Sequence, residues 1–182
     1  MTRGRISITM APKGQILINH PTVEAFIAAI GKDSGAQEPG LIFSIIGIHP
    51  QDLDDYRLQV WGRRLWADDE AGLQLEFKSA ALSSRDAGHG LDDGPWILTD
   101  VIFWGWRKET GTWYEGPMPR GLNFPMSRDL VRLQLQTELG DPIVFGFSAN
   151  VDVWMLGALE LAVDYDGDKG IRCISLALPP ED

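Results

Sequence analysis

The residues best suited to chemistry lie in one apolar segment, residues 96–107, which holds Asp100, Trp104 and Trp106. Side chains two positions apart on a strand share a face, and the two indoles are then about 7 Å apart. Paired indoles make a flat apolar platform with N–H donors, which suits a planar ligand or the face of a sugar. The segment therefore indicates a ligand-binding face. The alternative is that both tryptophans belong to the core, where tryptophan is usually found.

Asp100 is a weak candidate for catalysis, because it lies in the middle of this apolar segment. A partly desolvated carboxyl group has a raised pKa, which suits a general acid or a hydrogen bond to a ligand. The competing interpretation places Asp100 near a sheet end, facing solvent or paired with an arginine. The sequence places no second carboxylate beside it, so no catalytic residue is assigned beyond this candidate.

Residues 83–94 hold the weak candidates for a metal site, which are Asp86, His89, Asp92 and Asp93. Imidazole nitrogen and carboxylate oxygen are metal ligands, but the spacing matches no metal signature, and aspartate-glycine clusters are ordinary turn chemistry. The sequence therefore predicts a long surface loop here, with no metal and no cofactor.

The run Asp164-Tyr165-Asp166-Gly167-Asp168 opens like a calcium-binding loop. Its sixth position holds Lys169 instead of glycine, and its twelfth holds Ser175 instead of glutamate. A hairpin turn is the better interpretation. Signatures of nucleophilic hydrolases, phosphate-binding loops, zinc proteases and paired redox cysteines are absent from the chain.

A hairpin is expected to position the central segment. Residues 96–107 and 113–114 are rich in β-branched and aromatic residues, and they flank a loop that contains glycine. Alternation divides the first strand into two faces. The face predicted to be core includes Ile97, Val101 and Phe103. The opposite face carries Leu98, Asp100, Ile102, Trp104 and Trp106.

Residues 21–30 give the one persuasive helical pattern, an apolar stripe that recurs at helical spacing. The stripe consists of Val23, Phe26, Ile27 and Ile30. Pro21 suits the first helical position, and Gly31 suits the C-terminal stop. The sequence therefore predicts one amphipathic helix near the N-terminus.

Most other segments read as strands, because they alternate or are short apolar runs between turns. The expected strands are residues 5–10, 15–19, 41–48, 56–66, 73–78, 96–107, 131–137, 143–149, 159–165 and 171–178. A helix over residues 51–66 is the competing interpretation of one of them. Short turns favour antiparallel pairing. The predicted fold is mostly β (α+β by strict count): an antiparallel β-sandwich or curved sheet of about ten strands.

Residues 152–156 begin Asp152-Val153-Trp154 and lead into the alternating strand at 159–165. An Asp-x-Trp before a final alternating strand is similar to the closing strands of several β-sandwich binding modules. The similarity assigns no functional residue. No internal repeat or linker is visible, so a single β-rich domain over residues 1–182 is expected.

The net charge of the chain limits the kinds of molecule that it is expected to bind. The chain has 16 basic and 26 acidic residues and a net charge of −10, which repels nucleic acids and anionic membranes. No apolar run reaches the roughly 18 residues of a transmembrane helix, and the N-terminal segment lacks the apolar region of a secretory signal. The expectation is a cytoplasmic protein that binds neither nucleic acid nor membrane.

Two classes of function remain. The favoured one is a non-catalytic binding or protein-interaction domain, acidic and soluble, with the Trp-rich central hairpin as its core or binding face. Its partner would be a protein, for example a basic one, or a small neutral ligand. The alternative is a hydrolase acting on a glycan or other neutral ligand, with Asp100 near a platform of Trp104 and Trp106.

Overall fold

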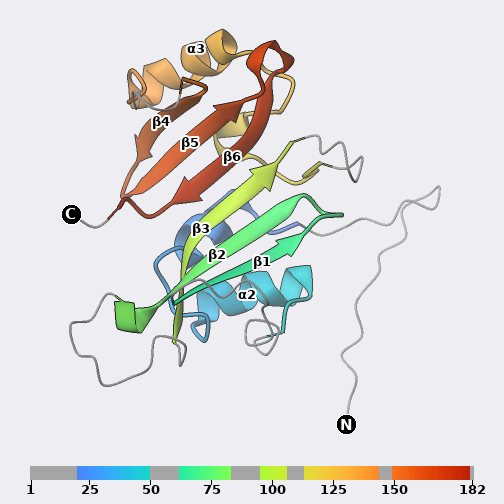
Figure 1. Ribbon diagram of the computed structural model, residues 1–182, viewed down its shortest axis with the longest axis vertical. Coiled ribbons are helices and arrows are strands. Elements are labelled where there is room, and N and C mark those ends of the chain that lie inside the picture. Colours follow the sequence, from blue (N-terminus) through green and yellow to red (C-terminus); the bar gives the residue numbers. More distant parts are fainter. Residues whose placement is uncertain (1–19, 50–61, 83–94, 106–112, 144–148, 181–182) are drawn as a thin grey trace, which may run out of the picture.

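A six-stranded antiparallel sheet dominates the computed structural model, which describes residues 20–49, 62–82, 95–105, 113–143 and 149–180. The strand order is β1-β2-β3-β6-β5-β4 (Figure 1). The strands are β1 (Arg63–Asp68), β2 (Leu73–Ser79), β3 (Trp96–Trp104), β4 (Val151–Leu156), β5 (Leu159–Tyr165) and β6 (Ile171–Ala177). The described α-helices are α1 (Val23–Ala29), α2 (Gln37–Ile46) and α3 (Arg128–Leu139). Short 3-10 turns occur at Ala80–Leu82, Pro119–Gly121 and Gly167–Lys169.

The sheet consists of two similar halves, which the sequence had not revealed as a repeat. Each half is an antiparallel meander of three strands, preceded by α1 and α2 in the first half and by α3 in the second, and β3 pairs with β6 at the centre. Trp66 opposes Leu75 in the first half, and Trp154 opposes Leu161 at the matching positions of the second. The unit of this fold is therefore a helix followed by three strands, used twice.

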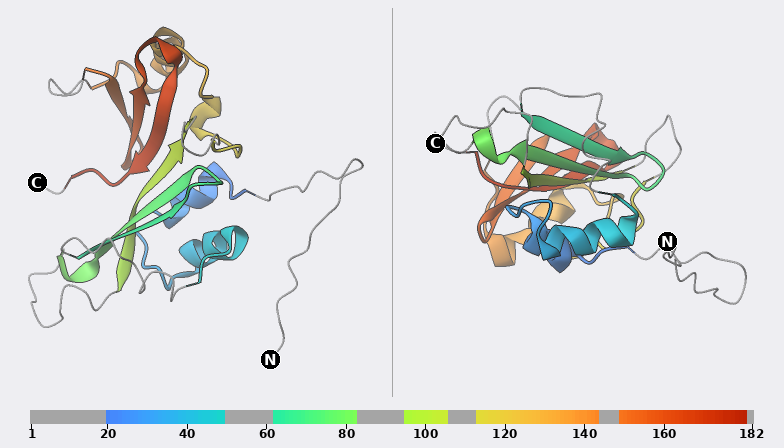
Figure 2. Two further views of the ribbon diagram at one scale, coloured as in Figure 1. Left: turned by 45° about the vertical axis from the view of Figure 1, so that its right-hand side comes forward. Right: turned by 90° about the horizontal axis from the view of Figure 1, so that it is seen from below.

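The helices cover one face of the sheet, so the predicted β-sandwich is wrong. Figure 2, in the view from below, shows all three helices on the same side of the strands. Phe26 of α1, Ile42 of α2 and Val131 of α3 are fully buried and belong to one core cluster with the inward residues of β2, β3, β5 and β6. The helices therefore take the place of a second sheet, because their apolar residues cover one face of the sheet.

Residues 41–48 were predicted to be a strand, but residues 41–46 belong to α2. The helix begins at Gln37, with Pro39 in its first turn, and it ends at Gly47, whose φ of 77° is left-handed. Proline is tolerated in a first helical turn, and glycine suits a left-handed C-terminal cap. The helix starts four residues before the apolar run and has ten residues in all.

Residues 131–137 alternate like a strand but form the centre of α3. The buried residues are Val131 and Leu135, four positions apart, whereas Leu133 between them is 67% exposed. Ser127 caps the helix by accepting a hydrogen bond from the amide of Leu130. The capping serine and the buried pair four positions apart favour a helix more strongly than the apparent alternation favours a strand.

The prediction of one main amphipathic helix near the N-terminus is also wrong. Helix α1 falls inside residues 21–30, with Thr22 as its capping residue. It has 7 residues, against 10 in α2 and 12 in α3. Ile27, part of the predicted apolar stripe, is 36% exposed. The three helices share the task of covering the sheet.

The structure supports the expected alternation in β2 and in the hairpin of β5 and β6. Leu73, Leu75 and Phe77 face the core as predicted. Asp166–Gly170 turns the chain between β5 and β6, as a hairpin rather than a calcium loop. Tyr114 lies outside any strand, although its amide donates to the carbonyl of Trp104. The expected strands at 5–10 and 15–19, and the competing helix over most of 51–66, lie outside the described residues.

Among the described residues, no helix has both the length and the hydropathy needed to cross a bilayer.

Candidate functional site

The face of the sheet opposite the helices carries two of the predicted site residues, Asp100 and Trp104, and we call it the open face. Its side chains are mostly half-buried, whereas the alternate side chains of β2, β3, β5 and β6 are buried in the core. The open face consists of Arg63, Leu65 and Ala67 from β1; Gln74, Glu76 and Lys78 from β2; Ile97, Asp100, Ile102 and Trp104 from β3; Val151, Val153 and Met155 from β4; Glu160, Ala162 and Asp164 from β5; and Arg172, Cys173, Ser175 and Ala177 from β6.

Three carboxylates form a row across the middle of the open face. Asp100 lies directly opposite Glu76 on β2 and opposite Ala177 on β6. Ala177 in turn lies opposite Glu160 on β5. We call Glu76, Asp100 and Glu160 the carboxylate row. It supplies the second carboxylate beside Asp100 that the sequence did not place, because the pairing joins distant segments.

The environment of Glu76 and Asp100 disfavours negative charge on these two carboxylates. Burial raises the pKa of Asp100, and a hydrogen bond from Thr99 and the charge of Arg63 oppose this only in part. Burial also raises the pKa of Glu76, and the facing charge of Asp100 raises it further. Like charges directly opposite on neighbouring strands are destabilising. The row is thus a place of incompletely compensated negative charge.

Replacing Glu76 by glutamine is expected to stabilise the protein at neutral pH by up to about 1 kcal/mol. The variant removes one of the two facing charges and keeps an acceptor for the amide of Gln74, 2.9 Å away. Because the folded-state pKa is raised, the gain is present at neutral pH and disappears as the pH falls below the unfolded pKa of about 4. Urea melts of the variant and the wild type at neutral pH and below pH 4 measure this gain in stability. Equal or lower stability of the variant at neutral pH would contradict this view of the row.

A β-bulge places Asp100 on the open face. Glu76 pairs with Asp100, but the next residue, Phe77, pairs with Leu98, so Thr99 is an extra residue in β3. The Thr99 hydroxyl donates to the carbonyl of Glu76, 3.1 Å away. The bulge exchanges the two faces along β3. Leu98 is therefore fully buried, and Ile97, predicted to be core, is half-buried on the open face.

Trp104 lies on the open face, and its indole N–H donates to the side-chain oxygen of Gln74 at 3.1 Å. The side chain is half-buried, so Trp104 is neither a core tryptophan nor part of a fully exposed platform. Trp106 lies outside the described residues, so the paired platform stays a prediction.

The predicted metal candidates Asp86, His89, Asp92 and Asp93 also lie outside the described residues. In the part of the chain that the structure describes, no group of three or more His, Cys, Asp or Glu side chains is arranged to hold a metal ion.

A second charged cluster joins α3 to β4. Asp152 is fully buried and accepts hydrogen bonds from both Arg128 and Arg132. The Nε atoms of Arg128 and Arg132 lie 3.0 and 2.8 Å from its Oδ2. Burial alone would raise the pKa of Asp152, but these hydrogen bonds lower it to about 2. Each charge has partners, so the cluster holds the fold together rather than offering a site.

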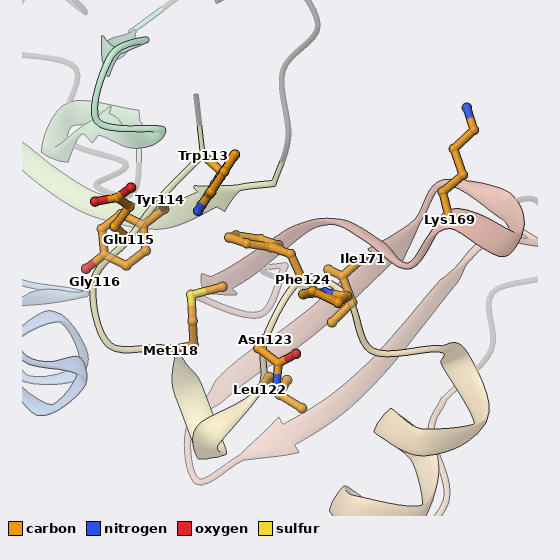
Figure 3. Close-up of a pocket in the computed structure, with 11 residues that line it drawn as sticks. Trp113, Tyr114, Glu115, Gly116, Met118, Leu122, Asn123, Phe124, Lys169 and Ile171 are labelled. Carbon is orange, nitrogen blue, oxygen red and sulfur yellow. The ribbon is translucent and has the colours of Figure 1, made fainter. Parts of the chain in front are cut away.

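A cavity of about 670 Å³ lies beside the chain segment that connects β3 to α3 (Figure 3). Its walls come from residues 113–125, from Lys169 in the 3-10 turn before β6, and from Ile171 at the start of β6. Trp113 was predicted to lie in a hairpin strand, and the cavity was not predicted. The proline-rich stretch after Trp113 was the available signal, because prolines favour an irregular chain path.

The described geometry therefore offers two places for ligands, the open face and the cavity. Glu76 and Asp100 provide a pair of carboxylates that can hold a cation or exchange protons. Comparison with protein-family models, with curated proteins and with solved structures finds no match for this chain.

Proposed function

We propose that the protein is a non-catalytic binding domain and that its open face binds a basic protein. The observation that carries this proposal is the carboxylate row, in which Glu76 and Asp100 face each other and Glu160 continues the line past Ala177. A lysine or arginine side chain of a partner, laid along the row, would interact with two carboxylates at once.

The energetics of the row favour binding over a purely structural role. Two facing carboxylates with raised pKa values destabilise the isolated protein. A partner's cation offsets that cost, because an opposite charge favours the ionised forms of Asp100 and Glu76. Surfaces that bind often carry such local costs in stability.

The remaining open-face residues suit a protein partner. Ala162, Ser175 and Ala177 are small, so the centre of the face is shallow enough for another surface to approach. Trp104 and the 42% exposed Met155 add the aromatic and thioether groups that are enriched in interfaces.

The basic groups of the open face compensate the row only in part, because the charge of Arg63 lowers the pKa of Asp100 and Glu76 less than burial raises it. Arg63 and Lys78 oppose each other on the two outermost strands of the first half. Arg172 is paired with Asp164, its guanidinium donating to that carboxylate. The net charge of −10 adds a long-range attraction for a basic partner.

Calorimetric titration with lysozyme, a compact basic protein, at low ionic strength tests the proposal. The triple variant Glu76→Gln, Asp100→Asn, Glu160→Gln is expected to bind at least about tenfold more weakly than the wild type. The control Glu38→Gln, Glu70→Gln, Asp129→Asn changes the net charge equally at exposed positions outside the open face. We expect it to weaken binding less than about twofold.

An equal loss of affinity in the two triple variants would contradict the proposal, because the attraction would then follow net charge alone. No measurable binding by the wild-type protein would also count against it.

A hydrolase acting on glycans stays a second candidate, because Glu76 supplies a carboxylate opposite Asp100. Glycoside hydrolysis uses such a pair, one as acid and one as base or nucleophile. It also needs a cleft that encloses the sugar, whereas the 670 Å³ cavity is lined by other residues. A chromogenic glycoside distinguishes the two functions: hydrolysis that is lost in Glu76→Gln and Asp100→Asn would favour the enzyme.

A further inference from the structure

We infer that the cavity beside Trp113 is a binding site for a small, neutral, planar aromatic compound. Its lining shares no residue with the open face, so the inference does not depend on the proposed function. A volume of about 670 Å³ lies within the range of small-molecule sites in proteins, roughly 300–1,000 Å³.

The walls present rings and a thioether. In Figure 3 the side chains of Trp113, Met118 and Phe124 converge on the same space, and all three come from the segment that connects β3 to α3. Trp113 is 44% exposed although it is the largest apolar side chain of the lining. Ring faces and methionine sulfur make favourable contacts with a third aromatic ring. This chemistry favours a planar aromatic ligand over a branched aliphatic one.

Backbone hydrogen bonds to the two central strands hold both walls in place. The amide of Tyr114, next to Trp113, donates to the carbonyl of Trp104 on β3 at 2.9 Å. The amide of Ile171 on β6 donates to the carbonyl of Phe124 at 2.8 Å. The cavity is therefore formed before a ligand arrives, which reduces the entropy cost of binding.

Two glycines, one after β3 and one before β6, allow the cavity wall at Phe124 to pack closely against the chain at these positions. A Cβ atom at Gly170 would lie 2.5 Å from the carbonyl oxygen of Phe124, and φ there is 105°. A Cβ atom at Gly105 would lie 3.0 Å from the Phe124 ring. Both positions exclude a side chain, so the wall depends on glycine at each.

The charges of the lining indicate a neutral ligand. Lys169 is 82% exposed, lies 3.4 Å from Asp166, and extends away from the cavity in Figure 3. Glu115 is exposed at the surface. A charged group placed among Trp113, Met118 and Phe124 would lose hydration without gaining a partner, which is costly.

Prodan, a neutral naphthalene dye whose emission reports polarity, tests the site. We expect saturable binding at one site, with a blue shift and energy transfer from tryptophan. Trp113→Ala is expected to weaken binding at least about tenfold. Asn123→Trp, which fills the cavity from an exposed position, is expected to do the same. Leu133→Ala removes a more exposed apolar side chain from α3 and should leave the affinity unchanged.

Urea melts on each variant separate loss of binding from loss of fold. The inference is overturned if folded Trp113→Ala and Asn123→Trp bind Prodan like the wild type, or if Leu133→Ala loses binding equally. It is also overturned if the wild type shows no saturable binding. Tighter binding of the anionic dye anilinonaphthalene sulfonate than of Prodan would overturn the neutral class of ligand.

Discussion

Replacing Asp152 by alanine is expected to lower the free energy of unfolding by about 3–5 kcal/mol. The carboxylate is fully buried, and it holds Arg128 and Arg132 of α3 against β4. Without it, two guanidinium groups lie together in a partly buried place and lose the carboxylate that pairs with both. Urea unfolding measures the loss. The matched control is Asp164→Ala, which breaks the more exposed pair with Arg172 and should cost less than about 1 kcal/mol.

The same cluster should make the protein sensitive to acid. The folded-state pKa of Asp152 is about 2, below the unfolded value of about 4. Its stabilising contribution is therefore complete above pH 4 and is lost as the pH falls towards 2. A variant lacking Asp152 should lose this part of the pH dependence. Equal costs for Asp152→Ala and Asp164→Ala, or an unchanged acid profile, would contradict the assignment.

Replacing Phe103 by alanine is expected to cost about 3–5 kcal/mol, the transfer free energy of the ring plus the cavity left behind. Phe103 is fully buried, with the rings of Phe26 and Tyr114 centred 5.4 and 4.9 Å away. It joins α1, β3 and the connecting segment that forms the cavity wall.

The neighbouring Ile102 provides the control for that measurement. Ile102 lies on the open face and is half-buried, so Ile102→Ala should cost clearly less than Phe103→Ala. Similar losses for the two variants would mean that both faces of β3 are core, and the open face would then be wrongly identified.

Alternation predicted the strands whose two faces differ. In β2 and β5 the inward residues are apolar and the outward ones are polar apart from Ala162, and both strands appear as expected. Alternation failed at residues 131–137, because Leu133 continued the apolar series on an exposed position of α3. Weighing the capping Ser127 and the pair Val131 and Leu135 would have identified that helix.

The candidate site depended on features that have no local signal. Asp100 was identified from its own strand, but its partners Glu76 and Glu160 come from strands distant in the sequence. The extra residue Thr99 decides which face of β3 each side chain occupies, and a bulge of this kind is not visible in hydrophobic periodicity. The residue types therefore predicted the strand, whereas the pairing of strands determined which side chains form the site.

The most direct test of the open face as a binding surface is a methyl NMR titration with lysozyme. We expect the largest chemical-shift changes at Ala162, Ala177 and Ile102, which surround the carboxylate row, and little change at Leu133 on the helical side. Raising the salt concentration should reverse the shifts, because the attraction is electrostatic. Changes centred on Leu133, or spread evenly over both sides of the sheet, would contradict the account.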